Sequence, residues 1–292
     1  MAAVAGIILV NPSAGPDDLS PDELRDRFSG HEVVECEPDE VADRTADAVK
    51  RGVDFVGVAG GDGTIRCAAQ QLTGTEVPLL PIPAGTRNHF AKDVGVPEIE
   101  DAVDAAKGQA VRVDVGEVNE HRFVNNSSIG IYPQIVVRRE AHEKRLPKGV
   151  ANIVAVWEQV RRRGQRLGVE VDGRRLQAWM VFVGNGRYGE GLIDLADRES
   201  LDGNELDVRI ALADKPLARL RLLLALLVGR LARSELLERM TTSAVTIDVD
   251  GRGAVDVALD GEVERIETPL CYRSIEGGLL VLVPPGLNTA ER

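Results

Sequence analysis

Three short loops rich in glycine and small polar residues are the part of this sequence best suited to chemistry. The loop at residues 60–64 (Gly-Gly-Asp-Gly-Thr) follows residues 54–59, an apolar run typical of a buried strand. Glycines leave the backbone amides bare, so that the amides can approach a phosphate closely. The one carboxylate, Asp62, stands where it could hold a metal ion on those phosphates, directly or through water. An ordinary Gly-Asp-Gly turn is the alternative for this loop taken alone.

Two similar loops flank it in the sequence. Residues 11–15 (Asn-Pro-Ser-Ala-Gly) follow the apolar run 7–10, and residues 85–88 (Gly-Thr-Arg-Asn) come shortly after the run 78–82. In open α/β sheets, ligands bind outside the carboxyl ends of the strands, so three such loops predict one shared crevice. Neither a Walker loop nor a G-x-G-x-x-G fingerprint occurs, so a nucleotide would be held in another way. The residues predicted to bind it are Asn11, Ser13, Gly15, Gly60, Gly61, Asp62, Gly63, Thr64, Gly85, Thr86 and Asn88.

These loops resemble the motifs of the diacylglycerol kinase catalytic-domain family, in its bacterial lipid kinase branch. The resemblance continues, in order and at plausible spacing, over nearly the whole chain. Its further motifs are residues 114–116 (Asp-Val-Gly), 123–125 (Phe-Val-Asn), 184–189 (Gly-Asn-Gly-Arg-Tyr-Gly), 201–207 (Leu-Asp-Gly-Asn-Glu-Leu-Asp) and 259–262 (Leu-Asp-Gly-Glu). The resemblance implies a kinase that uses ATP and Mg²⁺ to phosphorylate the primary hydroxyl of a lipid. Diacylglycerol is the first expected acceptor, and a sphingoid base or ceramide is the alternative.

The resemblance also implies two Mg²⁺ sites. Asp62 and Asp114 match an aspartate–water–metal network at the nucleotide, and a strand-end aspartate that caps a turn is the alternative for Asp114. Glu199, Asp202 and Asn204 match a structural Mg²⁺ site that would brace the second domain. Oxygen ligands of this kind suit a hard cation. An Asp-Gly hairpin without metal is the competing interpretation of the second site.

Asp260 and Glu262 are the candidates for taking the proton from the acceptor hydroxyl. They flank Gly261, and side chains two residues apart share a face if the segment is extended. Two acids on one face can raise each other's pKa, so that one acts as a base near neutral pH. The resemblance assigns the proton-acceptor role to this pair, with Glu262 as the expected base and Asp260 as its support, or the reverse. A solvated hairpin turn is the alternative.

The pattern of elements predicts an α/β protein with two domains. Strands alternate with helical stretches near 21–28, 40–51, 65–72 and 99–107, which is typical of a parallel sheet covered by helices. After about residue 116, strands joined by short turns predict a mostly antiparallel, sandwich-like β domain. The predicted strands are 169–171, 176–183, 206–212, 244–249, 254–259 and 264–273, with hairpins at Asp172-Gly173 and Asp250-Gly251 and helices at 149–163 and 216–237. By resemblance the apolar run 279–283 returns to the first domain, so that we predict an ATP-binding domain at 1–115 and 276–292 and an acceptor domain at 116–275.

Composition favours a cytoplasmic enzyme. A net charge of −12 argues against nucleic-acid binding, and the three cysteines have no metal or disulfide spacing. There is no leader pattern and no apolar run long enough to span a membrane. Basic residues gather in 138–166 and 215–233, and these segments are either ordinary solvated helices or surfaces for an anionic membrane. We therefore expect peripheral contact with the inner face of the membrane, and a homodimer is one open possibility.

Two departures from the family pattern concern the acceptor more than the reaction. His89 stands where the family usually has an aspartate, and Glu190 interrupts a glycine run. Two rival functions stay open: an NAD kinase, which also uses a Gly-Gly-Asp-Gly loop, and a non-catalytic nucleotide-binding regulator.

Overall fold

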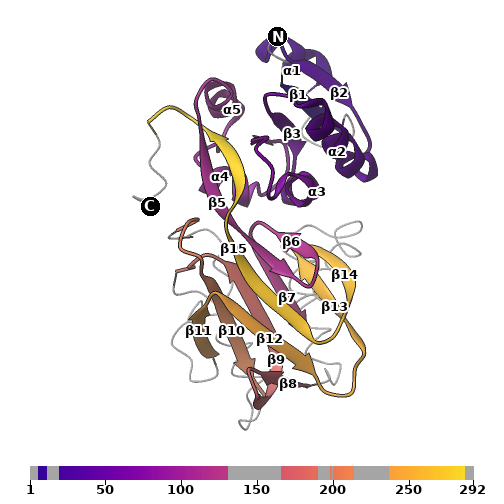
Figure 1. The fold of residues 1–292 in the computed structure, drawn as a ribbon, viewed down its shortest axis with the longest axis vertical. Helices are drawn as coiled ribbons and strands as arrows, with labels where there is room; N and C mark the ends of the chain where they lie inside the picture. Colours follow the sequence, from indigo (N-terminus) through magenta and orange to yellow (C-terminus); the bar gives the residue numbers. More distant parts are fainter. Residues whose placement is uncertain are drawn as a thin grey trace, which may run out of the picture.

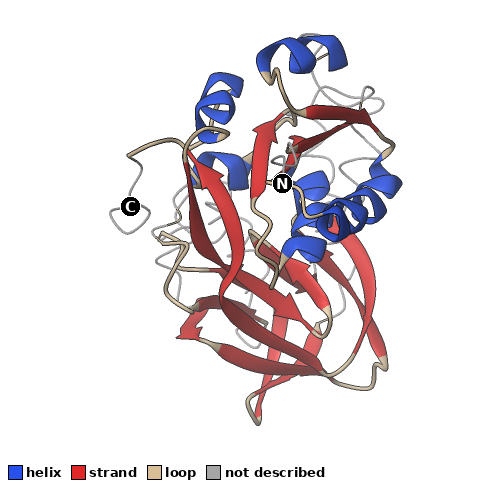
Figure 2. Ribbon diagram, turned by 45° about the horizontal axis from the view of Figure 1, so that its top comes forward, coloured by secondary structure: helices blue, strands red, loops and turns tan. Residues whose placement is uncertain are grey.

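Parallel and antiparallel strands join in one hydrogen-bonded sheet in this computed structural model, which describes residues 6–11, 20–130, 166–189, 198, 200–213 and 237–286. Figure 1 shows a helical part around the first strands and a larger part made of strands. Among the described residues, every helix lies between residues 21 and 105, and Figure 2 shows these helices gathered at one end of the molecule.

The helical part is built on four parallel strands in the order β2-β1-β3-β4. Their bounds are β1 Ile7–Val10, β2 Glu32–Glu35, β3 Val56–Gly60 and β4 Leu79–Pro83. All residues of β1 and β3 are buried, as expected of parallel strands covered on both faces. The helices are α1 Pro21–Arg27, η1 Pro38–Glu40, α2 Val41–Arg51, α3 Asp62–Leu72, α4 His89–Asp93 and α5 Ile99–Ala105.

The other part pairs its strands antiparallel and has its own hydrophobic core. Its strands are β5 Gln109–Val118, β6 His121–Phe123, β7 Asn126–Gly130, β8 Leu167–Val171, β9 Arg174–Asn185, β10 Leu206–Leu212, β11 Leu237–Thr242, β12 Ala244–Val249, β13 Ala254–Leu259, β14 Glu262–Glu267 and β15 Leu270–Val283. The predicted fold class, a parallel α/β domain followed by an antiparallel, sandwich-like β domain, is confirmed.

The long strand β15 belongs to both parts. It begins beside β12, runs antiparallel to β5, and ends parallel to β4, where Val281 pairs with Leu79. Its register shifts between Ile275 and Leu279. In Figure 1 it is the yellow strand that passes from the lower part to the upper one. The chain therefore returns to the first sheet, while the domain limits given above stay a prediction because one strand crosses them.

Several local predictions need correction. The hairpin at Asp172-Gly173 joins β8 to β9 as predicted, but Asp250-Gly251 forms no hairpin, because β12 and β13 pair with other strands. The predicted strand 264–273 is two strands, β14 and β15, separated near Pro269, whose missing N–H cannot join a ladder. The predicted helix 149–163 lies outside the described residues, and so does 216–237 apart from Leu237, which begins β11. No helix in the described part of the chain is long and apolar enough to cross a membrane.

Candidate functional site

Two of the three predicted glycine loops meet backbone to backbone. A Cβ atom added at Gly85 would overlap the Cα of Gly61. The amide of Ala84 also donates to the carbonyl of Gly60 at 3.3 Å. The side chain of Asn88 is used within its own loop, because it accepts from the amide of Gly85 at 2.8 Å and donates to the carbonyl of that residue at 2.9 Å. The prediction that these loops share one place in the fold is therefore fulfilled for residues 60–64 and 85–88.

Asp62 fastens these two loops together. It occupies the first turn of α3, which begins three residues earlier than the sequence predicted, with Gly61 as its N-cap. Its carboxylate accepts from the amides of His89 at 3.2 Å and Phe90 at 3.0 Å, at the start of α4. A third donor is Nδ2 of Asn125, at 3.2 Å. The free amides at the start of α3 thus lie beside a carboxylate of fixed position, an arrangement suited to a phosphate and its counter-ion.

The candidate base Glu262 reaches the same helix start from the other part of the molecule. A Cβ atom at Gly63 would overlap Oε1 of Glu262 and lie 2.9 Å from its Cδ, so that glycine lets this carboxylate lie against the backbone of the loop. The side chain of Thr64 packs similarly against Gly60, at 2.7 Å from the Cβ position there. The glycine loop at 60–64 and the candidate proton acceptor are therefore in direct contact.

Asp260 and Glu262 do not share a face of one extended strand. Leu259 pairs with Glu262 across a two-residue hairpin between β13 and β14, and φ is +49° at Asp260 and +96° at Gly261. An Asp-Gly pair with positive φ at both residues is typical of such turns. The turn is nevertheless anchored, because the Asp260 carboxylate accepts from the amides of residues 124, 125 and 126 at 2.8, 2.8 and 2.9 Å.

The cause of the raised pKa of the Asp260 carboxyl group also differs from the prediction. Burial raises its pKa to about 6, against the backbone amides of residues 124–126 and Arg66, which lower it. The neighbouring Glu262 is not among the main causes. Desolvation, rather than repulsion between two acids, therefore sets the pKa of this group.

The free energy of unfolding should depend on pH through the Asp260 carboxyl group. Its pKa is 3.8 without perturbation and about 6 in the fold, so the folded state binds more protons than the unfolded state between these values. The free energy of unfolding should therefore fall as pH rises through that window, by on the order of 3 kcal/mol from this group. Denaturant unfolding of the wild type and Asp260→Asn across about pH 4 to 7 measures it. An equal slope in both proteins would contradict the assignment.

Arg66 is a site residue that the sequence did not single out. It lies on α3, its side chain is 10% exposed, and it donates to Glu262 at 3.0 Å and to Glu264 at 2.5 Å. His121 approaches the other oxygen of Glu264 at 2.7 Å. Arg66 thus holds the candidate base from the helix that follows the glycine loop at 60–64. The sequence around Arg66 gives no signal for such a role, because its partners Glu262 and Glu264 are nearly 200 residues away.

Asp114 lies with the predicted second metal site. Its carboxylate accepts from the amides of Gly203 at 2.8 Å, Asn204 at 2.6 Å and Gly277 at 2.7 Å, and the residue is 2% exposed. It therefore fixes the loop that contains Asp202 and the register shift of β15. Its hydrogen bonds differ from those of Asp62, which is held at the start of α4.

The loop at 202–204 has one feature that fits a hard cation. Oδ1 of Asn204 is buried and has no hydrogen-bond partner, and an oxygen in this state is a suitable ligand. Asp202 is exposed and accepts from the hydroxyl of Ser200 at 2.8 Å. In the described residues, no group of three or more His, Cys, Asp or Glu side chains could hold a metal ion. Glu199 lies outside the described residues. Both predicted metal sites, the one at Asp62 and Asp114 and the one at 199–204, stay predictions.

The remaining predicted residues are distributed as follows. Asn11 is buried directly after β1, at the same end of the sheet as Gly60 and Gly85, because β1, β3 and β4 run parallel. Thr86 is exposed in the loop at 85–88. Ser13 and Gly15 lie outside the described residues, as does Glu190. The sequence missed Arg198 and Asp93, a buried ion pair between the segment after β9 and the end of α4.

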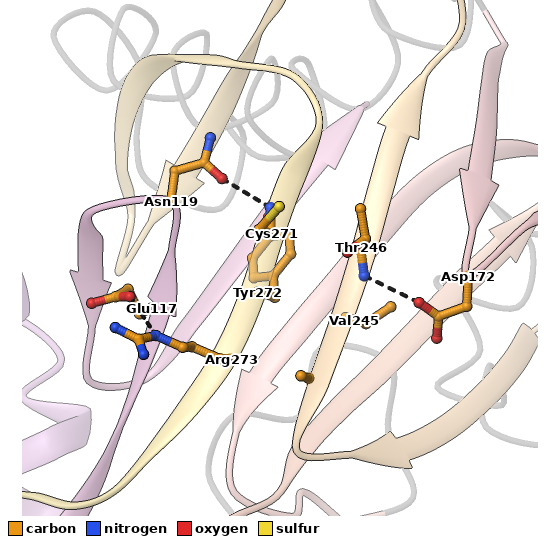
Figure 3. Close-up of a pocket in the computed structure, with 9 residues that line it drawn as sticks. Glu117, Asn119, Asp172, Val245, Thr246, Cys271, Tyr272 and Arg273 are labelled. Carbon is orange, nitrogen blue, oxygen red and sulfur yellow. Dashed lines mark hydrogen bonds and ion pairs between the residues drawn. The ribbon is translucent and has the colours of Figure 1, made fainter.

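A separate cavity of about 420 Å³ lies on the strands β5, β12 and β15, away from the glycine loops. Figure 3 shows its lining, in which Arg273 pairs with Glu117 and the amide of Thr246 donates to Asp172. The lining contains none of the predicted site residues. The candidate site is therefore the junction of the glycine loops with the β13–β14 turn.

Known proteins share both parts of this architecture. The domain described as "Diacylglycerol kinase catalytic domain" matches residues 6–118, and the "YegS C-terminal NAD kinase beta sandwich-like domain" matches residues 129–283. A diacylglycerol kinase of Mycobacterium tuberculosis is 31% identical over 87% of this chain and 84% of its own length. A protein of Pseudomonas fluorescens described as "Probable lipid kinase YegS-like" is 30% identical over 77% of this chain and 76% of its own length.

A solved structure has the same fold. The crystal structure of a diacylglycerol kinase from Bacillus anthracis has a TM-score of 0.70, with 22% identity over 97% of this chain and 98% of that one. The chain therefore belongs to the diacylglycerol kinase and YegS-like lipid kinase family, and is a phosphotransferase with an alcohol acceptor.

Proposed function

We propose that this protein transfers the γ-phosphoryl group of ATP to the primary hydroxyl of diacylglycerol and so forms phosphatidic acid. The observation that carries the proposal is the position of the Glu262 carboxylate directly over Gly63, in the first turn of α3. A proton acceptor beside a phosphate-binding loop is the arrangement that phosphoryl transfer to an alcohol needs.

The residues divide the work as follows. Amides at the start of α3 and in the loop at 85–88 would hold the phosphates, while Asp62 would hold Mg²⁺ through water. Mg²⁺ supplies neutralisation of charge on the phosphate oxygens. Glu262 would accept the hydroxyl proton, and Arg66 keeps its carboxylate at 3.0 Å on the side of the phosphate loop. Asp260 anchors the turn that carries Glu262.

The choice of diacylglycerol follows the names of relatives, such as that of Mycobacterium tuberculosis. A sphingoid base or ceramide offers the same primary hydroxyl, and stays the alternative acceptor. NAD is a second candidate, because the matched C-terminal domain is described as NAD kinase-like. We further propose that the enzyme meets its lipid by peripheral contact with a membrane surface.

The test is ATP consumption in mixed micelles that contain diacylglycerol, a sphingoid base or ceramide, with NAD as a soluble acceptor. Turnover that depends on diacylglycerol, stops when EDTA removes the metal and returns with excess Mg²⁺ supports the proposal. Turnover with another lipid alone would transfer the activity to that acceptor. Turnover with NAD and no lipid would replace the proposal by NAD kinase activity, and ATP binding without any turnover would replace it by a regulatory role.

A further inference from the structure

Asn125 is the one described residue that contacts both Asp62 and Asp260. Its Nδ2 donates to Asp62 at 3.2 Å, and its backbone amide donates to Asp260 at 2.8 Å. Its Oδ1 accepts from Arg198 at 3.1 Å, and its backbone carbonyl accepts from the hydroxyl of Tyr188 at 2.7 Å. Every polar group of this residue is therefore used, and two of them reach the predicted metal carboxylate and the turn of the candidate base.

Arg198 fixes which way the amide of Asn125 points. A guanidinium group has only donors, so it faces the oxygen of an amide and never the NH₂ group. With its oxygen directed to Arg198, Asn125 must present its NH₂ group to Asp62. The carboxylate of Asp62 thereby receives a third donor, in addition to the amides of His89 and Phe90.

Arg198 is itself held rigidly. Its side chain is 0% exposed, and its Nε donates to Asp93 at 2.8 Å, at the end of α4. Its Nη1 donates to the carbonyl oxygens of Val124 at 2.7 Å and Asn185 at 3.2 Å, and its Nη2 donates to Asp93 and to Oδ1 of Asn125. A buried cation whose partners are all fixed cannot reorient without leaving charge unpaired, which is costly. The amide orientation of Asn125 is therefore set by the fold.

We propose that Asn125 is a positioning residue that holds Asp62 and the Asp260 turn in register, and that Arg198 orients it. This inference rests on the proposed role of Asp62 at the metal-bound nucleotide. Partners in the second shell of a metal site orient the first ligands, and their loss typically costs about 10- to 100-fold in metal affinity or activity. We expect a loss of that size when the side chain of Asn125 is changed.

Two substitutions separate positioning from packing. Asn125→Ala removes the donor to Asp62 together with the acceptor for Arg198. Asn125→Asp keeps the size of the side chain and the acceptor for Arg198, and replaces the donor to Asp62 by a carboxylate oxygen that repels it. If the donor matters, both variants should lose about 10- to 100-fold in kcat/KM, with the half-saturating Mg²⁺·ATP concentration raised. Near wild-type kinetics in Asn125→Asp would overturn the proposal.

Ser127→Ala is the matched control. Ser127 lies two residues along the chain, is 0% exposed, and shares a buried hydrogen bond of 2.9 Å with Tyr272 that involves neither aspartate. This variant should lower the melting temperature while the kinetics of the folded enzyme stay within about threefold of wild type. An equal kinetic loss in Ser127→Ala at equal loss of stability would reduce Asn125 to a packing role.

Direct titration with Mg²⁺·ATP distinguishes failure of this inference from failure of the proposed function. It needs no acceptor, so it applies even if no lipid is phosphorylated. Asn125→Ala should bind Mg²⁺·ATP about tenfold more weakly than the wild type and Ser127→Ala. Equal affinity in all three proteins would overturn the positioning role whatever the acceptor is.

Discussion

Glu262→Gln should lower lipid-dependent turnover by about 10²- to 10⁴-fold, the usual contribution of a general base. Glutamine has nearly the same size and still accepts from Arg66, but it cannot take a proton from the acceptor hydroxyl. Nucleotide binding should persist, because the amides at the start of α3 are unchanged. Steady-state kinetics with a saturating lipid, combined with titration of Mg²⁺·ATP, measure both quantities.

Glu264→Gln is the natural control for this experiment. Glu264 also pairs with Arg66, at 2.5 Å, but it is held by His121 on its other oxygen and does not overlie Gly63. Its loss removes a comparable charge and should change turnover by no more than about threefold. If both variants fell equally, the charge around Arg66, and not proton transfer by Glu262, would explain the loss. Full activity of Glu262→Gln would direct attention to Asp260 as the base.

Gly85→Ala should separate the two glycine loops and abolish tight nucleotide binding. The added methyl group would overlap the Cα of Gly61 and lie 2.9 Å from Oδ1 of Asn88. Because the Cα of Gly61 is a backbone atom, the overlap can be relieved only by moving one of the two loops. We expect a loss of stability of about 1–3 kcal/mol and a fall in Mg²⁺·ATP affinity of at least about tenfold. Thermal unfolding and calorimetric titration measure these changes.

Gly253→Ala controls for the general effect of replacing glycine. A Cβ at Gly253 meets no atom within 4 Å, and its φ lies outside the left-handed region. The free energy of unfolding of Gly253→Ala should equal that of the wild type or exceed it by up to about 1 kcal/mol, since alanine restricts the unfolded chain. Wild-type affinity in Gly85→Ala would mean that the contact between the loops is not part of the nucleotide site.

The sequence predicted β1, β3 and β4, because these strands are apolar runs followed by glycine loops, but it gave no strand at β2 and no helix at α4. It missed β7, whose residues are Asn-Ser-Ser-Ile-Gly, because the strand is buried by pairing with β9 and β13 and not by its own hydrophobicity. The start of α3 was also missed, since glycines around Asp62 read as a helix breaker. An acidic residue in the first turn stabilises a helix there.

The candidate site was predictable only where its parts follow one another in the chain. The meeting of the loops at 60–64 and 85–88 follows from parallel strands, whose carboxyl ends share one edge. The anchoring of Asp260 joins residues more than 130 positions apart, and Arg198 lies 105 positions from Asp93. Such pairs leave no periodic pattern in a single sequence, so the network around Asn125 needed the structure.

The path of β15 has a consequence for how this protein is made. On the ribosome, β1 to β4 emerge before β15, yet among the described strands β5 pairs only with β15 and β6, and the edge of β4 opposite β3 pairs with β15. The sheet is therefore incomplete until residues 270–283 have been synthesised. Contacts between segments this distant in sequence form slowly, and exposed strand edges invite wrong partners in the meantime. The edge of β4 is therefore open to wrong partners until β15 has been synthesised.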